Sequence, residues 1–186
     1  LGAGGPVLPY LDIPMQHASD RVLAGMKRAY RGADLERLLD RLREKVPGIV
    51  LRTTLILGFP GETEEDFGTL MDFLERRQLD RLGVFGFSPE PGTAAERLAG
   101  RVPDGVVKRR LKGLRVLQDR LSRRKLKALV GETLETVGEG PGNGRTWRDA
   151  PEVDGRVEAP GLRAGTFAWV RITGATTHDL RGKVAG

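Results

Sequence analysis

Residues 49–63, with the sequence IVLRTTLILGFPGET, decide the fold. The first nine, Ile49–Leu57, are mostly aliphatic or β-branched, which is typical of a strand buried on both faces of a parallel sheet. A Gly- and Pro-rich sequence, Gly58–Gly61, then predicts a sharp turn. Thr63 and Asp66 have the spacing of a capping box, which predicts that a helix begins there. The stretch therefore predicts one strand–turn–helix unit.

The same pattern is found on both sides of this unit. Tyr10–Ile13 and Leu82–Phe87 read as two more strands. Helices are expected from Arg21 to about Tyr30 and over residues 35–46, where apolar residues recur at helical spacing. Repeated βα units predict an α/β fold with a parallel sheet. Because three strands cannot close a barrel, we expect part of a (βα) TIM-like barrel.

The last third of the chain shows a different sequence pattern. A long helix is predicted from Pro103 to about Leu129. Beyond it, short strand-like runs at 133–137, 156–158, 167–173 and 180–184 are separated by Gly, Pro, Asn and Asp. This pattern predicts a small all-β, OB-like barrel. We therefore expect two domains, 1–128 and 129–186.

Composition excludes several classes of site. Hydrophobic residues make up 39% and charged residues 30% of the chain, which is typical of a globular protein. Because there is no signal peptide and no apolar run approaching the roughly 20 residues of a membrane span, we expect a cytoplasmic protein without membrane contact. Cys is absent and there are only two His, so neither a metal site nor thiol catalysis is expected in this segment. No catalytic residue is predicted either.

The candidate site residues lie where the predicted strands end, which is the functional rim of a βα barrel. They are Gln16 and Ser19 after the first strand, the turn Gly58–Glu62 after the second, and Phe87 and Ser88 at the end of the third. Each also has a purely structural explanation: Ser19 can cap a helix, Gln16 and His17 can hold a loop, and Gly58 can serve a tight βα connection.

Charge is distributed unevenly. The net charge is +6, and residues 101–127 hold 11 basic residues against two acidic ones. This excess indicates either an anionic neighbour or simply a solvated helix face. Residues 129–186 hold 7 basic and 8 acidic residues, so the barrel lacks a net field that would draw a polyanion.

Three stretches together resemble the radical-SAM methylthiotransferases: residues 9–23, PYLDIPMQHASDRVL; residues 52–67, which contain GFPGETEEDF; and residues 87–94, FSPEPGTA. The C-terminal barrel resembles the TRAM domain of that family. The resemblance implies S-adenosylmethionine (SAM) and two [4Fe-4S] clusters as cofactors. The family binds the clusters through cysteines, and this chain has none. Since the chain also begins without Met, we expect a fragment of a longer enzyme that is inactive on its own.

The family has two relevant branches. The MiaB-like branch methylthiolates an adenosine of tRNA, and the RimO-like branch methylthiolates the β-carbon of an aspartate in the twelfth small-subunit ribosomal protein. Residues 12–19, DIPMQHAS, and the acidic run around Pro151 resemble the second branch. A tRNA-modifying enzyme and a non-catalytic RNA-binding β-barrel module remain the alternatives.

The resemblance and the charge distribution together imply roles for particular residues. The expected SAM contacts are Gln16, Ser19, Gly58, Phe59, Pro60, Gly61, Glu62, Phe87 and Ser88. The expected contacts to the basic ribosomal protein are Asp149, Glu152 and Asp154, because a carboxylate cluster attracts a basic partner. The basic helix 103–128 is expected to contact rRNA.

Overall fold

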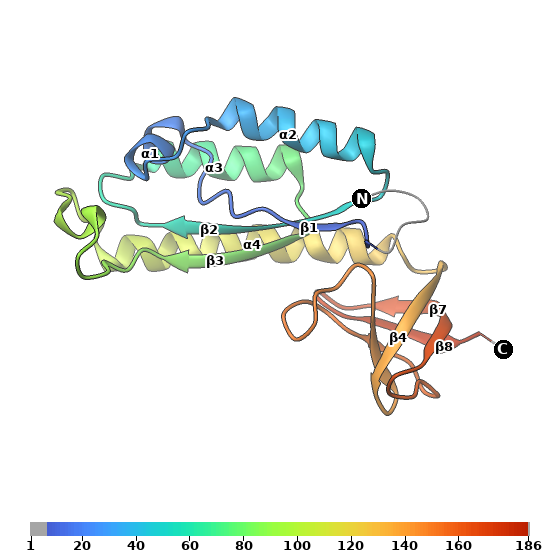
Figure 1. Ribbon diagram of the computed structural model, residues 1–186. Helices are drawn as coiled ribbons and strands as arrows, with labels where there is room; N and C mark the ends of the chain where they lie inside the picture. Colours follow the sequence, from blue (N-terminus) through green and yellow to red (C-terminus); the bar gives the residue numbers. More distant parts are fainter. Residues whose placement is uncertain (1–6, 186) are drawn as a thin grey trace. The chain divides into compact units, whose positions relative to one another are not determined.

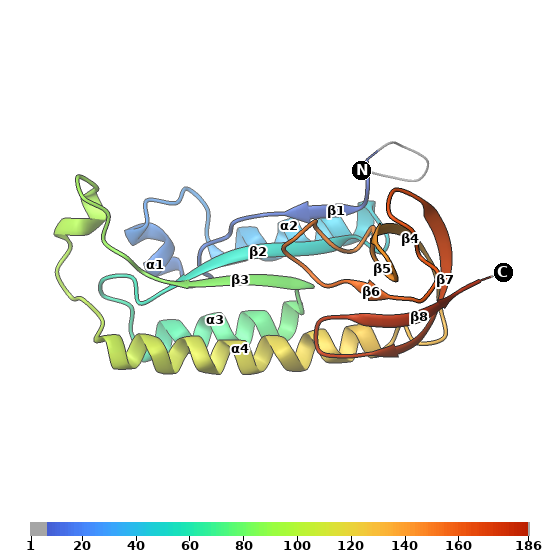
Figure 2. The same cartoon turned by 90° about the horizontal axis from the view of Figure 1, so that it is seen from below.

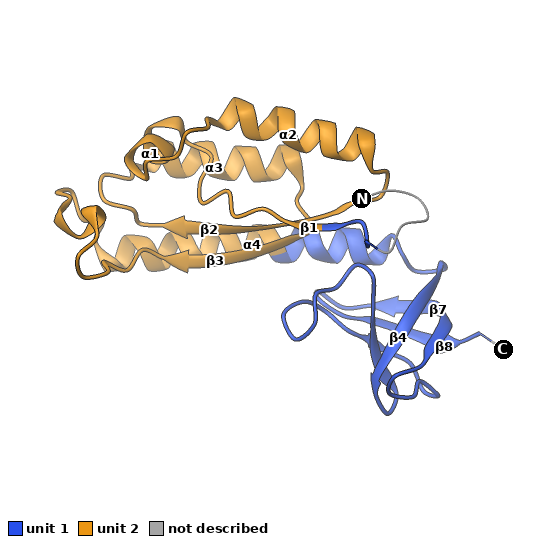
Figure 3. Ribbon diagram, viewed as in Figure 1, with its two compact units in different colours: residues 1–10, 119–186 blue, residues 11–118 orange. Residues whose placement is uncertain are grey.

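The computed structural model describes residues 7–185 (Figure 1). The described residues divide into two compact units, which are residues 7–10 with 119–185 (unit 1 in Figure 3) and residues 11–118 (unit 2). The division falls inside helix α4 (Asp104–Lys127), whereas the sequence places the domain boundary after that helix, near residue 128. None of the helices in the described part of the chain is both long enough and apolar enough to cross a membrane.

A three-stranded sheet forms the centre of unit 2. Its strands are β1 (Tyr10–Asp12), β2 (Val50–Leu57) and β3 (Arg81–Gly86), in the order β1-β2-β3 (Figure 2). β2 and β3 are parallel along their whole overlap. The segment after β1 continues beside β2, because the Gln16 N–H donates to the Thr54 carbonyl at 2.9 Å. The predicted parallel sheet is therefore confirmed.

The helices that follow these strands are α1 (Asp20–Gly25), α2 (Gly32–Lys45) and α3 (Glu64–Arg77), with a short 3₁₀ helix at Ala94–Arg97. The predicted capping box of α3 is present, with Thr63 and Asp66 each binding the other's backbone N–H. α1 ends earlier than predicted, at Gly25 rather than near Tyr30, because Lys27 adopts a left-handed conformation that a helix cannot include.

Strand β2 is not fully buried on both faces, so that expectation is wrong. Leu51, Thr53, Leu55 and Leu57 are at most 1% exposed, while Arg52, Thr54 and Ile56 alternate with them and are only half-buried. On the neighbouring strand, Phe85 is 60% exposed. One face of the sheet is thus closely packed and the other is partly open.

Unit 1 holds a closed five-stranded barrel of β4 (Thr133–Gly140), β5 (Asn143–Thr146), β6 (Val157–Glu158), β7 (Phe167–Ala175) and β8 (Leu180–Val184). Val157, Val170, Ile172 and Leu180 lie in its core. The sequence-based prediction missed β5, whose residues Asn-Gly-Arg-Thr show no apolar alternation. It forms because Gly144 lets its backbone approach β4: a Cβ there would lie 2.2 Å from the Val137 carbonyl oxygen.

Candidate functional site

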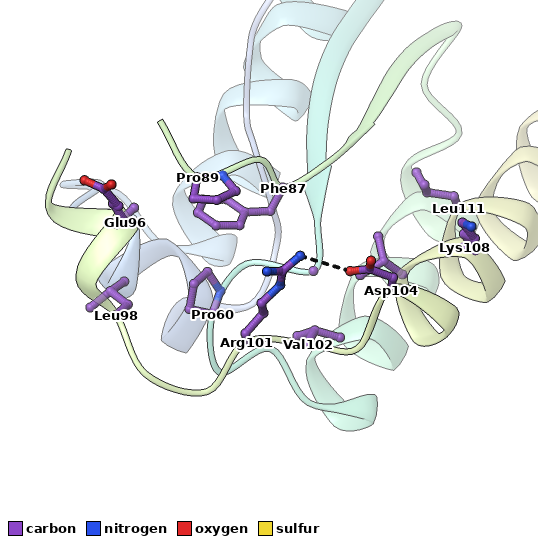
Figure 4. Close-up of a pocket in the computed structure, with 13 residues that line it drawn as sticks. Pro60, Phe87, Pro89, Glu96, Leu98, Arg101, Val102, Asp104, Lys108 and Leu111 are labelled. Carbon is purple, nitrogen blue, oxygen red and sulfur yellow. Dashed lines mark hydrogen bonds and ion pairs between the residues drawn. The ribbon is translucent and has the colours of Figure 1, made fainter. Parts of the chain in front are cut away.

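A cavity of about 340 Å³ lies where β2 and β3 end (Figure 4). Gly58 and Pro60 from the turn after β2, and Phe87 and Pro89 from the loop after β3, form part of its wall. The 3₁₀ helix, the loop after it and the first turns of α4 supply the rest, including the charged residues Glu96, Arg101, Asp104 and Lys108. The cavity thus combines an apolar wall containing an aromatic ring with charged groups of both signs.

The shape of the turn depends on Gly58. Its φ is +80°, in the left-handed region that favours glycine. A Cβ at this position would lie 2.5 Å from Cγ2 of Val107 on α4, so the missing side chain lets the helix pack against the turn. Further along, the Gly61 N–H donates to the Gly100 carbonyl at 2.7 Å and ties the turn to the loop before α4.

Three buried ionisable side chains lie beneath the turn: His17, Glu62 and Arg110, which we call the Glu62 cluster. Each is at most 5% exposed. Oε2 of Glu62 accepts the Gly58 N–H at 2.6 Å, and Oε1 accepts from Nη1 of Arg110 at 2.7 Å. Glu62 therefore joins the turn to α4 through its own carboxylate.

Burial sets the protonation behaviour of this cluster. It raises the pKa of the Glu62 carboxyl, although the Gly58 N–H and the Arg110 guanidinium oppose the shift. Burial also lowers the pKa of His17 to about 4, with Asp66 opposing the shift and Arg110 adding to it. His17 is therefore neutral at pH 7. Since Nδ1 accepts the Ser19 N–H at 3.0 Å, the imidazole proton lies on Nε2.

A second polar network lies beside the first and centres on Asp66. Ser19 donates its hydroxyl to Oδ1 at 2.6 Å, and Oδ2 accepts from the Thr63 N–H at 2.8 Å and from Arg21. Burial alone would raise the pKa of Asp66, but the hydrogen bonds from Arg21, Ser19 and Thr63 outweigh it and hold that pKa well below its usual range. The network fixes the start of α3.

The structure brings together only some of the residues predicted at the rim. Gly58, Pro60 and Phe87 line the cavity, and Phe59 is buried beneath it, edge-on to the Phe87 ring at 5.4 Å between centroids. Ser88 is exposed and does not line the cavity.

The other predicted rim residues lie elsewhere. Ser19 lines a different cavity, of about 570 Å³, between α1, α2 and α3, and its hydroxyl is bound to Asp66. Gln16 is half-buried and in neither cavity wall. Gly61 and Glu62 do not line the cavity but stabilise the turn, through the backbone of Gly61 and the carboxylate of Glu62. The predicted residues therefore divide into a cavity wall and its support.

The three acidic residues of the barrel do not form one exposed surface, which corrects the sequence-based expectation. Asp149 is only 6% exposed and accepts from the Thr146 hydroxyl at 3.0 Å. Asp154 is half-buried and accepts from the Tyr10 hydroxyl at 2.5 Å and from the Ala150 N–H at 2.9 Å. Glu152 alone is exposed. The short loop after β5 is held in place by two of its own carboxylates.

Sequence reasoning missed Arg110 and Asp66. Arg110 carried a usable signal, because it lies three residues after Val107 and four before Leu114 and thus falls on the apolar stripe of α4. A charged residue at such a position needs a buried partner. Asp66 was identified only as a cap, and no local pattern indicated its bond to Ser19, 47 residues away.

We expect the stability of the protein to fall between about pH 6.5 and pH 4 because of His17. In this window the unfolded chain takes up a proton that the buried imidazole, with its pKa of about 4, does not bind. A pKa shift of this size lowers the free energy of unfolding by about 3 kcal/mol as the pH falls across this window. His17→Asn should flatten the pH dependence of the free energy of unfolding, measured by urea titration.

The matched control is His178→Gln, because the His178 side chain is 60% exposed. That variant should keep the pH dependence of the parent chain. An unchanged profile in His17→Asn would show that His17 is not the group responsible.

Comparison with known proteins agrees with this architecture. Residues 1–74 match the family model of the radical SAM superfamily, and residues 124–185 match that of the TRAM domain. A coproporphyrinogen III oxidase (HemN) from Escherichia coli, described as a radical SAM enzyme, superposes with a TM-score of 0.54 at 21% identity, over 61% of this chain and 27% of the other. That likeness supports the fold alone.

Curated relatives are more similar in sequence. The chain is 49% identical over 98% of its length to the ribosomal protein uS12 methylthiotransferase RimO of Thermus thermophilus, and 46% identical over 99% to that of Ralstonia nicotianae. It spans 44% and 43% of those proteins, less than half of each. Over nearly its whole length the chain is therefore similar to proteins named ribosomal protein uS12 methylthiotransferase RimO, and it joins part of a radical-SAM fold to a TRAM domain.

Proposed function

We propose that this chain is part of an enzyme that methylthiolates the β-carbon of an aspartate in ribosomal protein uS12. The single observation that carries the proposal is the 49% identity over 98% of the chain to a protein named ribosomal protein uS12 methylthiotransferase. The test is to incubate the full-length enzyme with uS12 and to analyse its peptides by mass spectrometry. A methylthio group on the aspartate is the expected product.

The cavity at the ends of β2 and β3 fits one portion of SAM. Pro60, Phe87 and Pro89 offer an apolar surface for an adenine ring, and the Asp104 carboxylate at the start of α4 suits a ribose hydroxyl. When bound, SAM supplies a methyl group and radical chemistry. The residues of this chain would bind the nucleoside end, orient it against the strand ends and exclude water.

The chain does not fit an iron–sulfur cluster, because it contains no cysteine to supply thiolate ligands. Within the described residues, no group of three or more His, Asp or Glu side chains could hold a metal ion either. We therefore assign the two [4Fe-4S] clusters of the enzyme to a part of the protein outside this chain. It follows that the chain alone should yield no methylthiolated uS12.

On the barrel, Glu152 is the exposed carboxylate that we propose contacts the basic uS12. Complementary charge mainly accelerates association, so Glu152→Lys should slow the association of the full-length enzyme with immobilised uS12 by roughly two- to tenfold at low salt. Asp154 is excluded from this test because its substitution would also break the bond to Tyr10.

Glu135→Lys is the control for that measurement. Glu135 is exposed on β4, outside the loop that carries Glu152, and the substitution makes the same change of charge. Equal slowing by both variants would point to net charge rather than to the loop as the cause. If Glu152→Lys associates with uS12 at the same rate as the parent enzyme, the loop does not contribute to the uS12 interface.

The exposed cations of α4 are our proposed contact with rRNA. They include Lys108, Arg109, Lys112 and Arg115, all on the surface of the helix. A contact of this kind neutralises phosphates, so affinity for rRNA should fall steeply as salt is raised.

A further inference from the structure

One buried donor in the Glu62 cluster is not satisfied. The His17 ring is 0% exposed, and its proton lies on Nε2 because Nδ1 accepts the Ser19 N–H. Among the described residues, Nε2 has no hydrogen-bond partner. Native proteins seldom bury an N–H without an acceptor, because burial removes its bonds to water and returns none.

One acceptor beyond hydrogen-bond distance is the carboxylate of Glu62, which also binds the turn. Oε2 of Glu62 lies 3.9 Å from Nε2 of His17, about 1 Å beyond a hydrogen bond. That oxygen already accepts the Gly58 N–H at 2.6 Å, and a carboxylate oxygen has room for a second donor. The imidazole therefore faces an acceptor that it narrowly fails to reach.

A small movement of the turn would close this gap. His17 follows the segment that runs beside β2, and Gly58 follows β2 itself, so the two loops are carried by adjacent parallel strands. Gly58 and Pro60 also line the cavity proposed to bind the nucleoside end of SAM. A ligand seated against the turn would press on the backbone that carries Glu62.

We propose that His17 is a positioning residue for the Gly58–Glu62 turn, and that its Nε2–H bonds to Glu62 when SAM is bound. The proposal rests on the proposed function for the identity of the ligand. The new hydrogen bond exists only in the bound state, so it adds to the affinity for SAM rather than to the stability of the free protein. In the free protein the unsatisfied Nε2–H is destabilising, and ligand binding removes this unfavourable contribution.

Two substitutions separate these contributions. In His17→Asn, the amide oxygen takes the place of Nδ1 and still accepts the Ser19 N–H, but no donor remains at the Nε2 position. In His17→Gln, an amide N–H lies near the Nε2 position, but the acceptor for Ser19 is lost. His17→Gln should therefore keep the hydrogen bond to Glu62 that forms when SAM is bound. His17→Asn should keep the hydrogen bond from the Ser19 N–H, which stabilises the ligand-free protein.

The measurement is made on the full-length enzyme, with its SAM dissociation constant from equilibrium dialysis and its ligand-free thermal midpoint. We expect His17→Asn to bind SAM on the order of tenfold more weakly, and His17→Gln to stay within about threefold of the parent enzyme. The order of thermal midpoints should be the reverse, with Asn the more stable. His178→Gln should change neither quantity.

If His17 had only a structural role, the variant with the lower thermal midpoint would also be the one that binds SAM more weakly. That result would overturn the proposal. Full SAM affinity in His17→Asn, or no SAM binding by the parent enzyme, would overturn it as well. The proposed function can fail separately: an enzyme that binds SAM with the expected dependence on His17 but leaves uS12 unmodified keeps this inference and loses that function.

Discussion

Replacing Arg110 with Met is expected to lower the free energy of unfolding by about 3–5 kcal/mol, because the change leaves the Glu62 carboxylate buried without its cation. The two side chains are 3% and 0% exposed and lie 2.7 Å apart. Glu62 would still accept the Gly58 N–H, which does not compensate for an unpaired charge. Urea titration of the chain measures the loss.

Arg109→Met is the control, since Arg109 is the preceding residue on α4 and 64% exposed, with an ion pair to Glu64. An exposed pair of this kind contributes about 0–1 kcal/mol. The double variant Arg110→Met with Glu62→Leu should recover much of the loss, because no buried charge remains. If Arg110→Met costs no more than Arg109→Met, the Glu62 cluster does not hold the turn.

Gly58→Ala is expected to destabilise the chain by about 2–4 kcal/mol, through two additive causes. An alanine at φ +80° is strained, and its Cβ would lie 2.5 Å from Cγ2 of Val107. Val107 cannot rotate away easily, because β-branched side chains in a helix have one preferred rotamer. The turn or α4 must therefore shift, and the cavity wall changes with it.

Gly48→Ala isolates the first of these causes. Gly48 has a φ of +77°, and a Cβ added there would meet no atom within 4 Å, so that variant shows backbone strain alone. Adding Val107→Ala to Gly58→Ala should return the stability close to that of Gly48→Ala. Equal losses in the two single glycine variants would mean that α4 does not pack against the turn.

The parts of the fold that were predictable are those with local signals. The run Ile49–Leu57 indicated β2, and the Thr63–Asp66 spacing indicated the start of α3. β5 was missed because its formation depends on the close approach permitted by Gly144, which leaves no periodic pattern. The open face of the sheet was missed because a continuous apolar run does not reveal which side remains uncovered.

The site was predictable to the extent that it follows from topology. Gly58, Pro60 and Phe87 meet because parallel neighbouring strands end at the same edge of the sheet. Ser19 and Glu62 have partners 47 and 48 residues away, Asp66 and Arg110, and no local pattern pairs residues at such separations. Whether a polar residue faces a ligand or its own protein is decided by tertiary contacts.

We propose that the enzyme containing this chain modifies an aspartate of uS12. The most direct measurement supplies the reconstituted full-length enzyme with uS12 and tRNA together, at equal concentrations, and analyses both by mass spectrometry. We expect a methylthio group on a single aspartate of uS12, no methylthiolated adenosine in the tRNA, and no product when this chain replaces the full-length enzyme. Methylthiolated adenosine with unmodified uS12 would contradict the claim and assign the enzyme to the tRNA branch.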